Sequence, residues 1–69
     1  TRVRTVIVPS GDWLNLRDKA SASSAILARL LPKMTVQLLC ADMNGNTMWL
    51  FVSNGSLKGL VAARYVMET

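Results

Sequence analysis

The residue types that carry out most enzyme chemistry are scarce in this chain of 69 residues. It has no histidine, and its four acidic residues, Asp12, Asp18, Asp42 and Glu68, are scattered among predicted turns and the C-terminal end. Catalysis by a nucleophile needs a neighbouring base, and many hydrolases use a pair of carboxylates. The sequence therefore predicts no catalytic site and no enzyme activity.

Metal and cofactor sites are equally unsupported by the sequence. A zinc site needs several Cys or His ligands, and the chain has one cysteine, Cys40. Its four glycines do not form a nucleotide-binding motif. We expect no cofactor, no metal ion and no disulfide within the chain. Because Cys40 lies in an apolar run, residues 36–41, we expect it to be a small buried core residue.

Residues that could bind a ligand appear on one predicted strand, residues 13–17. Successive side chains of a strand point to opposite faces. Leu14 and Leu16 therefore share one face, and Trp13, Asn15 and Arg17 share the other. The second set could form a polar and aromatic strip on the surface.

The net charge of +4 favours an anionic partner, such as a cell-wall polymer, a membrane surface or nucleic acid. The basic residues are dispersed, with no run of five or more like charges. Proteins that bind single-stranded nucleic acid combine a basic groove with several aromatic stacking platforms, and this chain has few aromatic residues. Nucleic acid is thus the least favoured of these partners.

The spacing of strand and turn signals predicts an all-β domain. Strands rich in β-branched or alternating apolar residues are separated by turns containing Gly, Asn or Pro. The segment 20–31 is ambiguous, because its alanines and leucines would also suit a helix. Ile26, Ala28 and Leu30 also alternate, as in a strand, and Pro32 would end a helix nearby. We expect one helical turn at residues 63–65 before Val66. The predicted strands outside this segment are residues 1–8, 13–17, 35–41, 47–53 and 57–62.

Alternation along these strands predicts one hydrophobic core. The predicted core residues are Leu14, Leu16, Ile26, Leu30, Val36, Leu38, Leu50, Val52 and Val61. A chain of this length forms one small domain, residues 1–69, which we expect to be monomeric and cut from a longer protein. No apolar run approaches the ~20 residues that a membrane-spanning helix needs.

Six short segments, in chain order, resemble the bacterial SH3-like (SH3b) domain family. They are Leu14-Asn15-Leu16-Arg17; Ser21, Ser23 and Ser24; Ile26-Leu27-Ala28-Arg29-Leu30; Val36-Gln37-Leu38-Leu39; Trp49-Leu50-Phe51-Val52; and Gly59-Leu60-Val61 with Arg64-Tyr65-Val66. The resemblance implies a small SH3-like antiparallel barrel of about five to six short strands, and it favours a strand within the ambiguous segment 20–31. Several positions depart from the family pattern, and among them Lys19 and Ala20 stand where Gly-Pro is common. Leu60 stands where a Trp is usual, and Lys33 stands where Gly is common, so we expect that turn to adopt a conformation open to a side chain.

The resemblance also implies a non-catalytic binding module. Such a module would tether a larger extracytoplasmic protein, at the periplasm or cell surface, to peptidoglycan or another envelope component. The implied ligand-binding residues are Asn15, Arg17, Asp18, Trp49 and Tyr65. Arg17 would pair with a carboxylate, while Trp49 and Tyr65 would stack on apolar or sugar faces.

Structural roles are the alternative for the same residues. Arg17 would then pair with Asp18 or brace the following loop, Trp49 would cover the core, and Tyr65 would hold the last turn. In that case the domain would be an interaction or packing module that docks on a neighbouring protein domain and binds no polymer.

Overall fold

A computed structural model describes residues 2–68 of the chain, which form one antiparallel sheet of seven strands. The all-β prediction is confirmed, and the described residues contain no α-helix. The elements are β1 (Arg2–Val6), β2 (Leu14–Arg17), β3 (Ile26–Leu30), β4 (Thr35–Asn44), β5 (Thr47–Ser53), β6 (Lys58–Ala62), the 3₁₀ helix η1 (Ala63–Tyr65) and β7 (Val66–Glu68). The segment 20–31 contains a strand and not a helix, and the expected single helical turn is η1.

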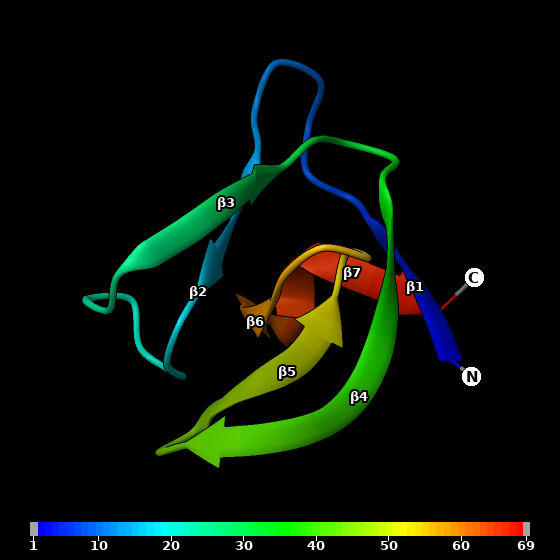
Figure 1. Ribbon diagram of the computed structural model, residues 1–69. Coiled ribbons are helices and arrows are strands. Elements are labelled where there is room, and N and C mark those ends of the chain that lie inside the picture. Colours follow the sequence, from blue (N-terminus) through cyan, green and yellow to red (C-terminus); the bar gives the residue numbers. More distant parts are fainter. Residues whose placement is uncertain (1, 69) are drawn as a thin grey trace.

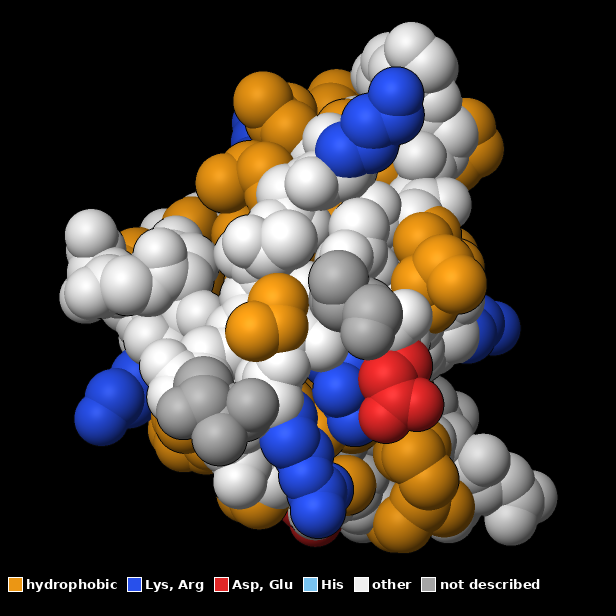
Figure 2. All heavy atoms as spheres, turned by 90° about the vertical axis from the view of Figure 1, so that its right-hand side faces the viewer, with side chains coloured by type: hydrophobic (Ala, Val, Ile, Leu, Met, Phe, Trp, Pro, Cys, Tyr) orange, Lys and Arg blue, Asp and Glu red, His pale blue; other side chains and the backbone are white. Residues whose placement is uncertain are grey.

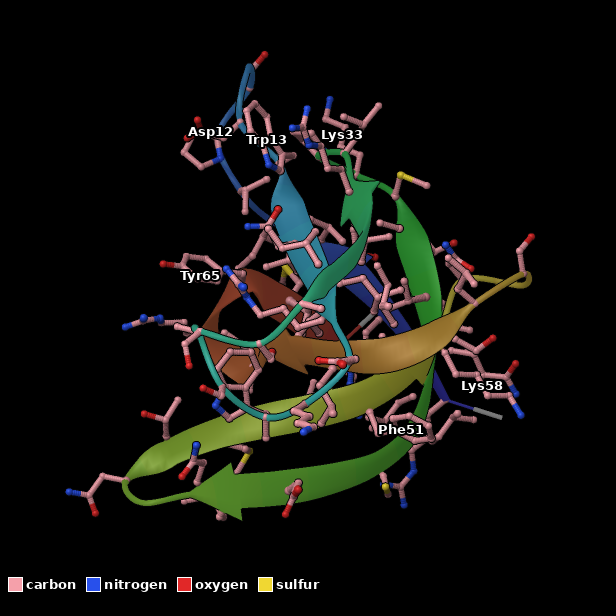
Figure 3. The ribbon with its side chains drawn as sticks, turned by 60° about the vertical axis from the view of Figure 1, so that its left-hand side comes forward. Asp12, Trp13, Lys33, Phe51, Lys58 and Tyr65 are labelled. Carbon is pink, nitrogen blue, oxygen red and sulfur yellow. The ribbon has the colours of Figure 1, made fainter. Side chains whose placement is uncertain are left out.

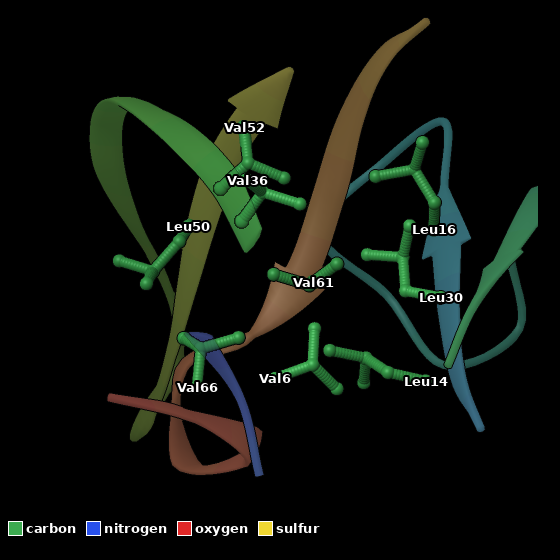
Figure 4. Packing of buried hydrophobic residues seen from close by; sticks show 9 residues of the cluster. All are labelled: Val6, Leu14, Leu16, Leu30, Val36, Leu50, Val52, Val61 and Val66. Carbon is green, nitrogen blue, oxygen red and sulfur yellow. The ribbon is translucent and has the colours of Figure 1, made fainter. Parts of the chain in front are cut away.

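The sheet curls around a single core (Figure 1). Its strand order is β3-β2-β6-β5-β4-β1-β7, and among residues 2–68 no pairing joins the two end strands, β3 and β7. Every strand nevertheless contributes to the core, which Figure 4 shows from close by. The buried cluster consists of Val6, Leu14, Leu16, Leu30, Val36, Leu50, Val52, Val61 and Val66.

Seven of the nine predicted core residues are in this cluster, and Leu38 packs against it while half-buried. Two members of the cluster, Val6 and Val66, were not predicted from the sequence. These residues lie opposite each other in the β1–β7 pair. Because β7 is only three residues long, it has too few positions for alternation to reveal which face is buried.

Ile26 was predicted to lie in the core and is instead 53% exposed. The β2–β3 pairing has Leu16 opposite Ala28 but Arg17 opposite Ile26, so Leu27 is an extra residue on β3. Such a β-bulge shifts the alternation by one residue. Ile26 therefore lies with Arg17 on the outer face of the sheet, the face away from the core.

Cys40 was predicted to be buried and is exposed, for the same reason. In β4, Leu38 pairs with Val52, but the next pair is Cys40 with Phe51, so Leu39 is an extra residue. Val52 belongs to the core, and its neighbour Phe51 points to the opposite face. The bulge thus places Cys40 beside Phe51 on the outer face.

The turn at Lys33 also differs from the expectation. Lys33 has a backbone φ of 70°, in the left-handed region that suits glycine, so the turn is not one that is open to any side chain. The backbone N–H of Lys33 donates to the carbonyl of Val6 over 2.9 Å, and Val6 N–H donates to Met34 over 2.9 Å. These two bonds fix the turn against β1 and hold Lys33 in this conformation.

Candidate functional site

One groove of about 380 Å³ brings together four of the five predicted binding residues, Asn15, Arg17, Trp49 and Tyr65. Asp18, the fifth, is exposed and does not line it. Ligand pockets usually measure about 300–1,000 Å³, so the groove is large enough for a small ligand or part of a polymer. Its other lining residues are Val8, Pro9, Asp12, Trp13, Leu14, Ala22, Thr47, Ala62 and Arg64.

Three elements of the outer face position the predicted residues. Asn15 and Arg17 point away from the core because they alternate with the buried Leu14 and Leu16 in β2. Trp49 lies on the same outer face, opposite Ala62 in the β5–β6 pair. Tyr65 comes from η1, the single turn that follows β6. The groove therefore combines parts of the chain that are about 50 residues apart in sequence, from Asn15 to Tyr65.

Each of two exposed aromatic rings in the groove makes a cation–π contact with an arginine side chain. The guanidinium carbon of Arg29 lies 4.5 Å from the centre of the Trp13 ring, and that of Arg64 lies 5.1 Å from the centre of the Tyr65 ring. Trp13 is 46% exposed and Tyr65 is 39% exposed. Figure 3 shows Asp12 and Trp13 where the β1–β2 loop runs into β2, and Tyr65 below them in the same view. Cation–π contacts of this kind attract the guanidinium group to the face of the ring and favour one relative orientation of the two side chains.

A hydrogen bond to Asn15 fixes the position of the Trp13 ring. The indole Nε1 of Trp13 donates a hydrogen bond of 3.1 Å to Oδ1 of Asn15. Because Trp13 precedes β2 and Asn15 is its second residue, this bond ties the end of the loop to the strand. The side chain of Asn15 is thereby partly engaged, and its amide nitrogen is the part left to meet a ligand.

Arg17 braces the loop between β2 and β3, which agrees with one of the structural alternatives. Its Nη1 donates to the carbonyl of Ser24 over 2.8 Å. The ion pair with Asp18 that the sequence suggested is not formed among residues 2–68. The guanidinium group still lines the groove, so bracing the loop and meeting a carboxylate are compatible.

The backbones of β6 and β2 approach closely at Gly59, and this approach fixes the position of Arg17. A Cβ atom added to Gly59 would lie 2.6 Å from the backbone oxygen of Arg17 and 2.9 Å from Cγ of Leu16. Only glycine permits this distance between β6 and β2. Gly59 therefore positions the Arg17 edge of the groove from the neighbouring strand.

Trp49 forms the floor of the groove and offers little surface for stacking. It is 7% exposed, although it lies on the outer face of the sheet. The loop between β2 and β3 reaches the same groove through Ala22, and Asn44 Nδ2 donates a hydrogen bond to the carbonyl of Ala20 in that loop. The exposed aromatic rings of the groove are therefore those of Trp13 and Tyr65, and not that of Trp49.

Nine lining residues of the groove were not among the predicted ligand-binding residues, and those with charged or aromatic side chains are Asp12, Trp13 and Arg64. The alternation of residues 13–17 did place Trp13 on the outer face, which was the available signal. Asp12 and Arg64 gave no such signal, because each lies in a turn or a 3₁₀ helix where alternation does not apply.

The groove combines apolar, aromatic and charged side chains. It has an apolar floor, two exposed aromatic rings, the guanidinium groups of Arg17 and Arg64, and one carboxylate, Asp12. Among residues 2–68 no group of three or more His, Cys, Asp or Glu side chains could hold a metal ion. Such a surface suits a ligand with apolar or sugar faces and one or more carboxylates.

Positive charge elsewhere is spread thinly. Figure 2 shows one face of the molecule, on which most Lys and Arg side chains are separate, while two lie next to each other beside an acidic side chain. The single ion pair found among residues 2–68 joins Arg4 and Glu68 over 3.7 Å, and Glu68 is largely exposed. The groove, with its paired aromatic and arginine side chains, is therefore the most distinctive part of the described surface.

Neither a protein family, nor a curated protein, nor a solved structure was found to match this chain. Within residues 2–68 there is no helix of the length and apolar character needed to cross a membrane.

Proposed function

We propose that this domain is a non-catalytic binding module of SH3-like architecture that holds a larger extracytoplasmic protein on peptidoglycan. The observation that carries this proposal is the convergence of four residues, Asn15, Arg17, Trp49 and Tyr65, in one groove. Those residues were selected from short motifs that resemble SH3b domains. The motifs were chosen for their order along the chain, which does not require these four residues to be neighbours. That they line one groove supports the proposal.

The proposed ligand follows from the groove. The peptide stems of peptidoglycan carry free carboxylates and are joined to sugars, so they present both anionic groups and flat apolar faces. Arg17 and Arg64 would pair with the carboxylates, and Trp13 and Tyr65 would stack on the sugar or peptide faces. Exposed ion pairs contribute about 0–1 kcal/mol each, so we expect weak binding that falls as salt rises.

The test is a pull-down of the domain on purified peptidoglycan at low and at high salt. Tyr65→Ala and Arg64→Ala should reduce the bound fraction. Tyr65→Phe keeps the ring and should bind nearly as well as the unmodified domain. Arg2→Ala, which removes an exposed arginine outside the groove, controls for net charge. Trp49→Ala is unsuitable, because loss of a buried ring would disturb folding.

An outcome in which salt and these substitutions have no effect would exclude the groove as the binding surface. Absence of binding at every salt concentration would favour the second candidate function, a module that packs against a neighbouring protein domain. One observation supports that alternative. Ile26, Arg17, Leu60, Phe51 and Cys40 are paired successively across five strands, and they form a mostly apolar row on the outer face.

A further inference from the structure

The longest strand, β4, is only partly paired on one of its edges. β1 pairs with Thr35–Leu38 of β4, and beyond Leu38 no strand among residues 2–68 pairs with that edge. Residues 39–44 are all exposed. Figures 1 and 3 both show this part of β4 at the margin of the molecule, with no other strand beyond it.

The direction of the backbone groups on this edge follows from the β4–β5 hairpin. Gly45, with a φ of 62°, and Asn46 form a two-residue turn closed by the pair Asn44–Thr47. The closing pair of such a turn is hydrogen-bonded, and bonded and non-bonded pairs then alternate. Asp42 is therefore bonded to β5, whereas Ala41 and Met43 direct their N–H and C=O groups outwards.

A side-chain contact supports this assignment. The N–H of Met43 donates to Oδ1 of Asp42 over 2.9 Å. A carboxylate of the preceding residue thus satisfies an edge donor that no strand reaches. Charged side chains on an edge are a common means of keeping it from pairing with other chains.

We propose that the edge of β4 from residue 39 to residue 44 accepts an extended segment of a partner protein as an additional antiparallel strand. The site continues an interface that already exists, because β1 occupies the first half of the same edge. Backbone groups that point outwards at every second residue are complementary to one kind of occupant, a polypeptide in extended conformation. This proposal concerns a surface other than the groove.

The side chains along the edge define the partner further. Met43 lies opposite Met48 on one face of the hairpin, where Met43 is 56% exposed and Ala41 is its neighbour on the strand edge. Asp42 is on the other face and is the one charged residue of this stretch. The partner strand should place apolar or β-branched side chains beside Ala41 and Met43, and a basic side chain beside Asp42. Entry of the partner displaces the Asp42 carboxylate from the Met43 N–H.

The two end strands of the sheet are less suitable. β3 contains the bulge at Leu27 and carries Arg29, and β7 is three residues long and contains Glu68. Bulges, charges and short length all disfavour the addition of a strand. The second half of β4 also starts with a bulge, at Leu39, but residues 40–44 beyond it pair regularly with β5 and carry a single charge.

A suitable probe is a capped synthetic peptide with the sequence of β1, Arg-Val-Arg-Thr-Val, which alternates basic and β-branched residues and already pairs with this edge. We expect the peptide to shift the NMR signals of residues 39–44 of the whole chain and to slow amide exchange at Ala41 and Met43. The exchange rate of the Asp42 amide, which is bonded to β5, should change little. Signal changes confined to the groove or to β3 or β7 would overturn the proposal.

Two matched peptides test whether the backbone carries the binding. N-methylation of the peptide nitrogens that face β4 should abolish binding, because their donors are removed. N-methylation of the alternate nitrogens, which face away, should leave binding largely intact. Equal effects of the two peptides would contradict strand addition.

Variants of the protein give a second test. Ala41→Pro removes an edge donor that β5 does not use, so we expect peptide binding to be lost while the Trp49 amide stays protected. Ala41→Val keeps the donor and should still bind. Should Ala41→Pro fail to fold, the N-methylated peptides decide the question.

Charge reversal tests the predicted partner chemistry. Asp42→Lys should lower the affinity for the peptide by about two- to fivefold. A peptide with Glu in place of the Arg that faces residue 42 should restore the affinity. Sedimentation of the protein without peptide is the remaining control. A dimer with protected Ala41 and Met43 amides would identify a second copy of the chain as the occupant and would overturn the proposal of a separate partner.

Discussion

Arg17 and Ile26 lie directly opposite each other across the β2–β3 pair, on the outer face of the sheet. The bulge at Leu27 brings this pair together by turning Ile26 out of the core. Arg17 is in turn paired with Leu60 of β6, so the bulge extends an apolar row from β6 to the end strand β3. The irregularity thus changes the surface of the domain more than it changes its core.

Stability measurements can separate the two faces of β3. Leu30→Ala removes a side chain that is fully buried, and we expect a loss of about 2–5 kcal/mol in the free energy of unfolding. Ile26→Ala, on the exposed face, should cost less than about 1 kcal/mol. Urea denaturation of both variants measures the difference. Equal losses would mean that the bulge at Leu27 is absent in solution.

Gly59→Ala should destabilise the domain by about 1–3 kcal/mol, because the new methyl group would press against the backbone of Arg17 and the side chain of Leu16. The variant should also shift the NMR signals of Arg17. Gly55→Ala is not a suitable control, since Gly55 has a positive φ. Ser56→Ala, at an exposed position in the preceding turn, should have little effect on stability. An unchanged free energy of unfolding in Gly59→Ala would show that β2 and β6 can move apart without loss of stability.

Lys33→Gly should stabilise the protein by about 0.5–1 kcal/mol. A left-handed conformation costs a residue with a side chain about 1–2 kcal/mol, and the greater freedom of glycine in the unfolded chain offsets about 0.5–1 kcal/mol of that gain. Lys33→Ala removes the charge and keeps the Cβ atom, so it should not stabilise. Thermal unfolding of the two variants is the measurement. Similar midpoints for glycine and alanine would refute backbone strain at this turn.

Cys40 should react with a water-soluble thiol reagent in the folded protein at nearly the rate seen in urea, because its side chain is exposed. It is the one cysteine of the chain, so the signal has a single source. Strong protection of the thiol in the folded state would restore the buried position that simple alternation predicts for Cys40.

The strands and most of the core could be predicted from the sequence because their signals are local. Alternation in β2 and β5 placed Leu14, Leu16, Leu50 and Val52 inside, and the structure confirms them. The two wrong positions, Ile26 and Cys40, each lie next to a bulge. A bulge depends on how a strand meets its neighbour, so alternation along one strand cannot reveal it.

The groove could be predicted only in part. Asn15 and Arg17 share one face of one strand, and the resemblance to SH3b domains named them as candidates together with Trp49 and Tyr65. The burial of Trp49 and the approach of Arg29 to Trp13 depend on how the loop and β3 fold against other strands. Interactions between distant segments of this kind leave no periodic trace in the sequence.

The neighbouring arrangement of β1 and β7 has a mechanical consequence. The two strands are antiparallel, with Arg4 opposite Glu68 and Val6 opposite Val66, so their outer ends lie at the same end of the pair. Tension between those ends loads the hydrogen bonds one after another, as in opening a zipper, and then draws Val66 out of the core. The domain should therefore yield at low force when stretched from end to end. A load applied between the groove and β1 takes a different path, through β2, β6, β5 and β4, and must shear several strand pairs together.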